Sequence, residues 1–327
     1  MKTTLEKFPA GLRAPGEVSA ALRRFSMFTA AWAAFVIFAG AQVTSTGSGL
    51  AVPDWPLSYG MFFPPMVGGI FYEHGHRLVA GTFGVLTLIQ AIWLQLRAPS
   101  ARLRKLGWAL LGTTIVQGLL GGLTVKLLLP RPVSVSHGLV AEIAFCIAVS
   151  IAFFVSRFYG ALQTLERGDA PIGLTTSLVV VAFLQVFAGA VMRHRGAGLA
   201  IPDFPLSFGR LVPPLTSFDV AINFVHRLGA LAVVILVITT VLRLMRFASQ
   251  HPLRQLAVTL VVVVTGQIVL GAFTIWSGKA PVITSFHVMN GAITLALSFV
   301  VALTARTIGW RTETQRAAAI LASEVTA

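Results

Sequence analysis

The sequence predicts an all-α membrane protein whose eight transmembrane helices form two four-helix bundles related by a parallel repeat. Three observations support this prediction. Of the 327 residues, 56% are hydrophobic and only 11% are charged, whereas soluble domains usually carry about 25% charged residues. Apolar runs of about 20 residues, the length needed to cross a bilayer, recur along the whole chain. Distinctive motifs of the first half also recur in the second half.

The pattern of apolar runs places four spans in each half of the chain. We expect these spans at residues 25–45, 75–96, 106–127, 134–156, 172–192, 220–242, 254–275 and 282–305. They divide the chain into an N-terminal tail (1–24), a first four-helix half (25–160), a second four-helix half (161–305) and a C-terminal tail (306–327).

The distribution of charge predicts the topology. The net charge of +14 comes from Lys and Arg residues that cluster in the two tails and in the connections after the second and sixth spans. We expect the protein to lie in the inner membrane of the cell. The positive-inside rule then places both termini in the cytoplasm and the long loops 46–72 and 195–218 outside. No basic stripe alternates with exposed aromatic residues, so a nucleic-acid partner is not expected. Because Cys146 is the single cysteine, an intramolecular disulfide is excluded.

The repeat is clearest in the two outer loops and around four histidines. Gly49-Leu-Ala-Val-Pro-Asp-Trp-Pro-Leu-Ser-Tyr-Gly60 recurs as Gly198-Leu-Ala-Ile-Pro-Asp-Phe-Pro-Leu-Ser-Phe-Gly209. At an offset of about 150 residues, His76-Arg77 matches His226-Arg227 and His137 matches His287. Because each unit holds four spans, both units enter the membrane from the same side, and the repeat is parallel.

The four matched histidines are candidate metal ligands. His76, His137, His226 and His287 each lie near the start of an even-numbered span, so they are expected at one depth below the outer surface. A single intramembrane histidine is most often a helix-packing residue, but imidazole in lipid is costly and usually functional. Two histidines on facing helices suit axial ligation of a heme iron. Zinc and copper sites fit less well, because they normally include more ligands or a sulfur ligand.

The two halves differ at one acidic position. Glu73 stands three residues before His76, so the two side chains share a helix face, whereas the matching residue before His226 is Asn223. A carboxylate beside a cofactor ligand is a candidate for proton transfer or for stabilising a cation. The alternative is a structural carboxylate that pairs with Arg77 or is solvated.

Each half also carries one arginine directly after a candidate ligand. Arg77 follows His76, and Arg227 follows His226. The guanidinium fork pairs carboxylates bidentately, so both arginines are candidates for contacts with heme propionates. Anchoring to lipid phosphate is the commoner role of such residues.

In these motifs the chain resembles the heme A synthase family of membrane enzymes. The resemblance covers residues from about 25 to 305 and rests on five short motifs. These are Gly49-Leu-Ala-Val-Pro-Asp-Trp-Pro56, Glu73-His-Gly-His-Arg77, Ser136-His-Gly138, Val225-His-Arg227 and Phe286-His287. Many members carry a cysteine pair in the first outer loop, and this chain has none there.

The resemblance implies an oxidation of heme O to heme A for terminal oxidases, in which a methyl group becomes a formyl group with water as the oxygen source. It implies that His226 and His287 hold a permanent heme b as cofactor, and that His76 and His137 flank the substrate heme O. It also implies that Glu73 is the catalytic residue. Heme O synthase, a terminal oxidase, membrane lipid and further copies of the chain are the partners that this reading suggests.

Two other classes of function are compatible with parts of the pattern. The first is a diheme electron-transfer protein of the cytochrome b kind, with a quinone partner and no modification of heme. The second is a transporter, which would place its polar residues at the midplane of the membrane. The polar residues gather at the outer edge instead, which disfavours a transporter, and Glu73 favours the enzyme over the cytochrome.

Overall fold

The computed structural model describes residues 18–163 and 170–325, with side chains as far as residue 309. Residues 1–17 of the predicted N-terminal tail lie outside this range. The described chain is helical, with no strand, and its elements are α1 (Ala20–Ser45), α2 (Gly68–Arg97), α3 (Ala101–Lys126), α4 (Arg131–Phe154), α5 (Arg157–Leu162), α6 (Ile172–His194), the 3-10 helix η1 (Ala197–Leu199), α7 (Phe218–Leu244), α8 (Pro252–Trp276) and α9 (Pro281–Val325).

The prediction of eight membrane helices is confirmed within the described residues. Eight of the helices are long and apolar enough to cross a bilayer, including residues 281–309 of α9. Large apolar side chains remain exposed along them, as with Leu119, Ile235 and Val262. Such side chains face lipid, whose hydrocarbon is as apolar as they are. The chain is therefore a multi-pass membrane protein.

Several element boundaries differ from the prediction. Helices α1 and α3 begin at Ala20 and Ala101, five residues before the predicted starts at 25 and 106, so residues 20–24 of the predicted N-terminal tail are helical. Helix α2 begins at Gly68 rather than at residue 75, directly after the extended residue Val67. The short helix α5 was not predicted; it is too short to show a period and is started by the Ser156 side chain, which accepts from the N–H of Tyr159. Helix α9 continues through most of the predicted tail 306–327 to Val325, because residues 310–325 contain neither Gly nor Pro.

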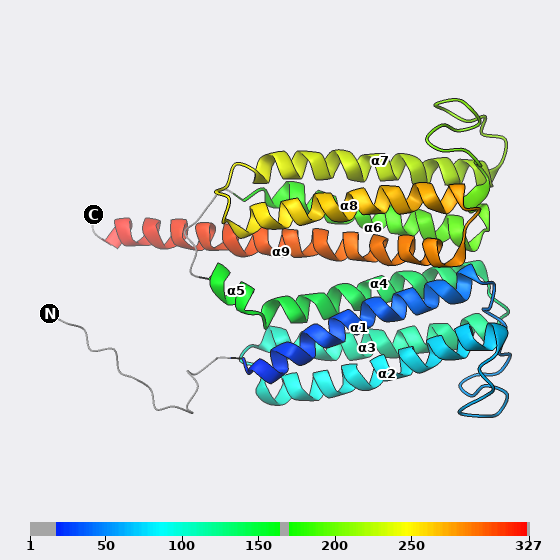
Figure 1. Cartoon of the computed structure of the whole chain (residues 1–327). Coiled ribbons are helices and arrows are strands. Elements are labelled where there is room, and N and C mark those ends of the chain that lie inside the picture. The colour runs from blue at the N-terminus through cyan, green and yellow to red at the C-terminus, as the bar shows by residue number, and fades with distance from the viewer. Residues whose placement is uncertain (1–17, 164–169, 326–327) are drawn as a thin grey trace.

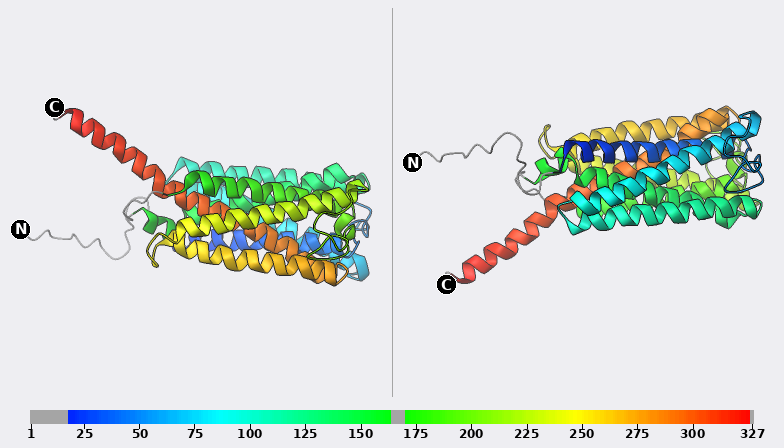
Figure 2. Two further views of the ribbon diagram at one scale, coloured as in Figure 1. Left: turned by 90° about the horizontal axis from the view of Figure 1, so that it is seen from above. Right: turned by 90° about the horizontal axis from the view of Figure 1, so that it is seen from below.

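The long helices form two groups that lie side by side (Figure 1). In the first group each of α1 to α4 contacts the next, and α1 contacts α4; the second group, α6 to α9, closes in the same way. The groups meet where α9 packs on α1 and where α4 packs on α6 and α9. The views from above and below show the same alignment of helices, with α9 extending beyond the others (Figure 2). The parallel repeat itself stays a prediction.

The buried cores of the two groups share residues across this boundary. The core around Phe145 and Ala148 of α4 also contains Ala292 and Ala296 of α9. Conversely, the core around Leu253 and Val301 of the second group contains Phe153 of α4. Helices α4 and α9 therefore contribute apolar side chains to both groups.

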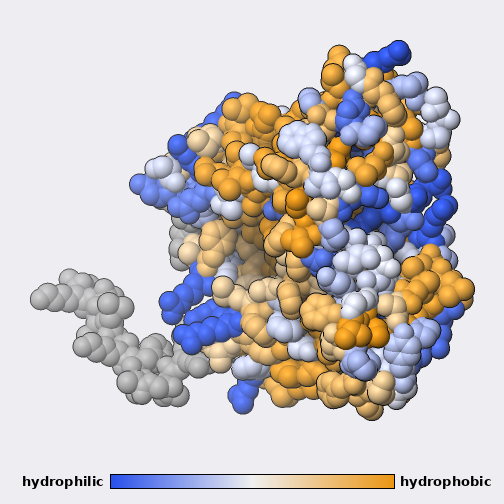
Figure 3. Space-filling model, turned by 45° about the vertical axis from the view of Figure 1, so that its right-hand side comes forward, coloured by the Kyte–Doolittle hydropathy of each residue, from blue (hydrophilic) through white to orange (hydrophobic). Residues whose placement is uncertain are grey.

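The two longest loops in the described part of the chain lie at one end of the bundle. The loops between α1 and α2 and between α6 and α7 both project from the end opposite the start of α1, each beyond its own group of helices (Figure 1). Figure 3 brings the loop end forward and shows many apolar side chains among the polar ones on this face. Several of them, including Phe62, Phe63 and Leu211, are highly exposed.

The arrangement gives a direct test of topology. A reporter fused after Ser100, between α2 and α3, should report the side opposite to a reporter fused at Ser207 in the second long loop. Fusions at Ser249 and Ser277 provide matched controls, since they lie at the same ends as Ser100 and Ser207 respectively. Paired alkaline phosphatase and fluorescent protein fusions measure this. If the fusions at Ser100 and Ser207 reported the same side of the membrane, the eight-span arrangement would be contradicted.

Candidate functional site

The four predicted histidines lie near the loop end of four different helices. His76 is on α2, His137 on α4, His226 on α7 and His287 on α9. Within each closed group of four helices, α2 lies diagonally across from α4, and α7 lies diagonally across from α9. Each pair of imidazoles can therefore approach the centre of its bundle from opposite sides.

The second pair has a spacing that suits a metal atom between the rings. The centroids of the His226 and His287 rings are 6.5 Å apart, and the ring planes are inclined by 79°. Two metal–nitrogen bonds of about 2.0–2.1 Å, with about 1.1 Å from each ring centre to its nitrogen, would place coaxial centroids about 6.3 Å apart. The residues present thus fit the axial ligands of a heme iron.

Each histidine ring lies against a glycine of the preceding helix. The glycines are Gly40 on α1, Gly121 on α3, Gly189 on α6 and Gly271 on α8. A Cβ atom added to them would lie 3.0, 3.1, 2.9 and 3.1 Å from Cε1 of His76, His137, His226 and His287 respectively. At Gly189 the ring or the helix would have to shift, and at the other three glycines the ring would have to move by a few tenths of an ångström. The matched segments Phe38-Ala-Gly-Ala41 and Phe187-Ala-Gly-Ala190 were the available sequence signal for two of these glycines.

The ring nitrogens are incompletely paired in the protein. The Nδ1 atoms of His76, His137 and His287 are buried and have no hydrogen-bond partner among the described residues. In contrast, Gln185 reaches His226, with 3.1 Å from its Nε2 to the ring Nδ1 and 2.8 Å to the His226 carbonyl oxygen. An unpaired buried polar atom costs about 1–3 kcal/mol. A further group that pairs with these Nδ1 atoms would offset this cost.

Glu73 is buried, with only 4% of its surface exposed, and both carboxylate oxygens accept hydrogen bonds. The backbone N–H of Val52 donates to Oε2 at 2.8 Å, and Nη2 of Arg77 donates to Oε1 at 2.6 Å. Glu73 therefore connects the first outer loop to α2 and forms an ion pair one helical turn along. Each oxygen keeps a second lone pair, so the carboxylate can still accept a proton or face a cation.

Arg77 and Arg227 hold the outer loops onto the helices. The Arg77 guanidinium donates to the carbonyl oxygens of Asp54, Leu57 and Val52 at 2.7, 2.8 and 3.1 Å. Arg227 donates to the carbonyl oxygens of Leu206 and Ile201 at 2.8 and 3.0 Å. These contacts were not predicted from the sequence, which suggested heme propionates as partners. That role stays a prediction.

Asn223 takes the place of Glu73 in the second half. Its Nδ2 donates to the carbonyl oxygens of Ala197 and Gly198, at 2.9 and 3.2 Å, and its Oδ1 accepts from Nε of Arg227 at 3.0 Å. An amide suffices here because the loop presents carbonyl oxygens to it. In the first half the loop presents the N–H of Val52, which a carboxylate oxygen accepts.

An aspartate closes a turn inside each loop. Asp54 accepts from the N–H groups of Gly60 and Tyr59, at 2.8 and 2.7 Å, and these bonds lower the pKa of its carboxyl group. Asp203 accepts from Gly209 and Phe208, both at 2.7 Å, with the same effect on its pKa. The Pro-Asp-aromatic-Pro motifs are thus ordered turns, fixed both internally and to α2 or α7.

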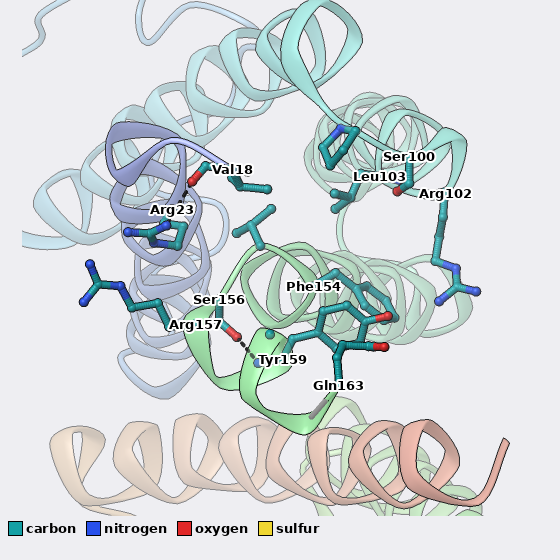
Figure 4. A pocket seen from close by; sticks show the side chains of 13 residues that line it. Val18, Arg23, Ser100, Arg102, Leu103, Phe154, Ser156, Arg157, Tyr159 and Gln163 are labelled. Atoms are coloured by element: carbon teal, nitrogen blue, oxygen red, sulfur yellow. Dashed lines mark hydrogen bonds between the residues drawn. The ribbon is translucent and has the colours of Figure 1, made fainter. Parts of the chain in front are cut away.

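A separate cavity of about 640 Å³ lies at the opposite end of the first group (Figure 4). Leu103 and Phe154 line its apolar part, while Arg23, Arg102 and Arg157 lie around it. None of the predicted site residues lines this cavity. The candidate site is therefore the region around the histidine pairs near the loop end.

The fold and the site define a multi-pass membrane protein that carries a histidine pair in each of two helical groups, with a carboxylate beside one pair. Residues 69–299 match the family model described as "Cytochrome oxidase assembly protein". The chain belongs to this family. The resemblance predicted from the sequence is confirmed.

Relatives named "Heme A synthase" match most of the chain. The protein of Symbiobacterium thermophilum is 32% identical over 262 residues, which cover 77% of this chain and 85% of that protein. The protein of Alkalihalophilus pseudofirmus is 28% identical over 294 residues, covering 87% and 98%. That of Halalkalibacterium halodurans is 27% identical over 277 residues, covering 82% and 91%.

The close approach of glycine to histidine gives a second prediction. In Gly189→Ala, the new Cβ atom would displace the His226 ring, so the purified protein should hold markedly less heme per chain than the parent. Gly266→Ala is the matched control, because no atom lies within 4 Å of its added Cβ atom. That change should be neutral or stabilise α8 by up to about 1 kcal/mol. Equal heme contents in the two variants would show that the ring position is not constrained by Gly189.

Proposed function

We propose that this protein is a heme A synthase, which oxidises a methyl group of heme O to a formyl group and supplies heme A to terminal oxidases. The observation that carries the proposal is the combination of family membership with a buried carboxylate beside one histidine pair only. Conversion of methyl to formyl with water as the oxygen source releases four electrons and four protons. The protein must therefore provide a site for charge development and a route for electrons.

The two histidine pairs receive different roles in this proposal. His226 and His287 hold heme b as a permanent cofactor, supported by the 6.5 Å separation of their ring centroids. When bound, heme b supplies one-electron chemistry. His76 and His137 orient the substrate heme O near Glu73, which follows from the position of Glu73 three residues before His76 on α2.

Glu73 acts at the substrate site by its charge and by its free lone pairs. Its burial removes competing water, so its negative charge stabilises positive charge developing at the oxidised carbon more strongly than in solution. The same carboxylate can accept the proton of an attacking water molecule. Val52 and Arg77 fix the orientation of the carboxylate for either role.

The orientation of the enzyme in the membrane is inferred from the distribution of charged residues. The loop end faces outward from the inner membrane of the cell, and both termini are cytoplasmic. Heme O synthase and a terminal oxidase are partners that supply the substrate and receive the product. Association of several copies of the chain is compatible with the apolar surfaces of the long helices.

A diheme electron-transfer protein is the second candidate function. One observation favours it: both oxygens of Glu73 are already engaged, as in a structural ion pair that fixes a loop. In that case both histidine pairs would hold hemes that carry electrons to or from a quinone, and no heme would be modified.

Replacement of the second histidine pair tests the cofactor assignment. His226→Ala and His287→Ala should each remove heme b from the purified protein or convert it from low spin to high spin, because one axial ligand is lost. Optical and paramagnetic resonance spectra, with pyridine hemochrome quantification, measure this. An unchanged low-spin spectrum and heme content in both variants would exclude these residues as the ligands.

Replacement of Glu73 tests its chemical role. Glu73→Gln keeps the size of the side chain but removes its charge, and the loss of one stabilising group typically costs about 2.7–4 kcal/mol. Turnover should therefore fall by roughly a hundredfold or more. The variant should still retain heme b and should accumulate unreacted heme O. Heme A formed per bound heme b, determined by chromatography and mass analysis of extracted hemes, is the measurement.

Asn223→Ala is the control for loop anchoring in that experiment. It removes the matched contact between loop and helix in the second half without touching the carboxylate. Loss of heme O oxidation in Glu73→Gln, with retained activity per heme b in Asn223→Ala, supports the chemical role. If Glu73→Gln had a ratio of heme A to heme b close to that of the parent, Glu73 would have no role in the mechanism. That result would favour the diheme electron-transfer protein.

A further inference from the structure

Arg193 occupies a place in the second group that has no charged counterpart in the first. It lies one helical turn beyond Gly189 on α6, so the two residues share a helix face, and Gly189 is the glycine against which the His226 ring packs. The matching position in the first group is Thr44, which lies one turn beyond Gly40. Thr44 donates to the Gly40 carbonyl oxygen on its own helix. The two groups thus differ on the loop side of the histidine pairs.

The guanidinium of Arg193 is only partly satisfied by the protein. Nη2 donates to the carbonyl oxygen of Ala41 at 2.7 Å and to Oγ of Ser45 at 2.9 Å, both on α1. Nη1 is buried and has no hydrogen-bond partner within the described residues. These contacts hold the guanidinium in place at the junction of the two groups and leave one nitrogen without an acceptor.

No carboxylate of the described residues balances this charge. The ion pairs in that part of the chain join Arg77 to Glu73 and Arg195 to Asp219. Arg193 takes part in neither. A buried charge without a counter-ion is costly, and the cost is largest when a donor also lacks an acceptor. An anionic group that accepts from Nη1 would offset this cost.

The location of Arg193 indicates what that group is. Arg193 shares a helix face with Gly189, against which the His226 ring packs. Its acceptor, Oγ of Ser45, lies 3.3 Å from Oγ of Ser285, two residues before His287 on α9. Arg193 therefore lies near both residues of the second histidine pair. A molecule held between His226 and His287 would carry its acidic substituents close to this arginine if they are directed toward the loop end. Arg77 and Arg227 already donate to loop carbonyl oxygens.

We propose that Arg193 binds a propionate carboxylate of the heme held by His226 and His287, with Nη1 as the donor that this carboxylate satisfies. The inference rests on the proposed function, since it requires a heme at that pair. It assigns to Arg193 both the retention of this heme and the control of its reduction potential. Through Ala41 and Ser45, the same guanidinium links the heme of the second group to α1 of the first.

The primary test is the redox midpoint of heme b in purified Arg193→Gln. Ferric heme carries one more positive charge than ferrous heme, so removal of a nearby cation favours the ferric form and lowers the midpoint. We expect the one-electron equilibrium to shift at least tenfold, which corresponds to about 59 mV. An unchanged midpoint with normal heme content would overturn the proposal. Spectroelectrochemical titration of the low-spin band measures it without any turnover.

Two further variants separate propionate binding from a purely structural link between α6 and α1. Ser45→Ala removes an acceptor of Nη2 but keeps the charge, so it should leave the midpoint at the parent value. Arg193→Lys keeps the charge but lacks the fork, so heme b should transfer to apomyoglobin about tenfold faster than from the parent. If Arg193→Gln fails to fold, the rate of heme transfer from Arg193→Lys tests whether Arg193 binds the propionate. A midpoint shift in Ser45→Ala, or parental transfer from Arg193→Lys, would establish a structural link alone.

The parent protein distinguishes failure of this inference from failure of the proposed function. Absence of low-spin heme b from the parent would remove the cofactor assignment itself. Arg195→Gln is the matched control for loss of a neighbouring positive charge, because Arg195 pairs with Asp219 at 2.6 Å and both side chains are partly exposed. It should leave the midpoint of heme b unchanged. A shift as large as that of Arg193→Gln would show a general effect of charge and overturn the specific contact.

Discussion

The close approach of imidazole rings to helix backbones is the constraint on which the rest of this structure depends. A ring placed inside a four-helix bundle must displace the side chain of a neighbouring helix, and glycines provide that space on α1, α3, α6 and α8. The constraint fixes which faces of these helices turn inward. It thereby fixes the places of Glu73 and Arg193, each about one turn from a histidine or its glycine. The lipid-facing surfaces need only be apolar.

The sequence was sufficient for the fold class, the number of spans and the four histidines, because each depends on a strong local pattern. Length and hydropathy define a span without knowledge of its neighbours, and duplicated motifs identify matched histidines. Contacts of Arg77 with loop carbonyl oxygens could not be predicted, because they depend on the path of a loop whose contacting residues lie 20 to 25 residues earlier in the chain, at Leu57 and Val52. The start of α2 at Gly68 was missed for a similar reason. Gly-Gly does not favour a helix, and tertiary contacts compensate, since Gly69 lies close to Ala51 of the loop.

The two groups differ in charge at matched positions near the histidine pairs. A carboxylate at residue 73 and an amide at residue 223 occupy corresponding places and contact corresponding arginines. On the loop side of the glycines, the first group has Thr44 and the second has Arg193. In the proposed function the acid lies in the group that modifies its heme, and the additional cation lies in the group that retains its heme. In this proposal, a few polar side chains on two similar groups of four helices set the function of each group.

The exchange of core residues between the two groups has a consequence for folding. Ala292 and Ala296 complete the core of the first group, and Phe153 contributes to the core of the second. A fragment that ended between the groups would leave apolar cavities or unmatched surfaces on α4 and α9, each with a cost of the kind that follows truncation of core side chains. We therefore expect the two groups to unfold as one cooperative unit. In that case a ligand bound at either histidine pair would stabilise the whole membrane domain.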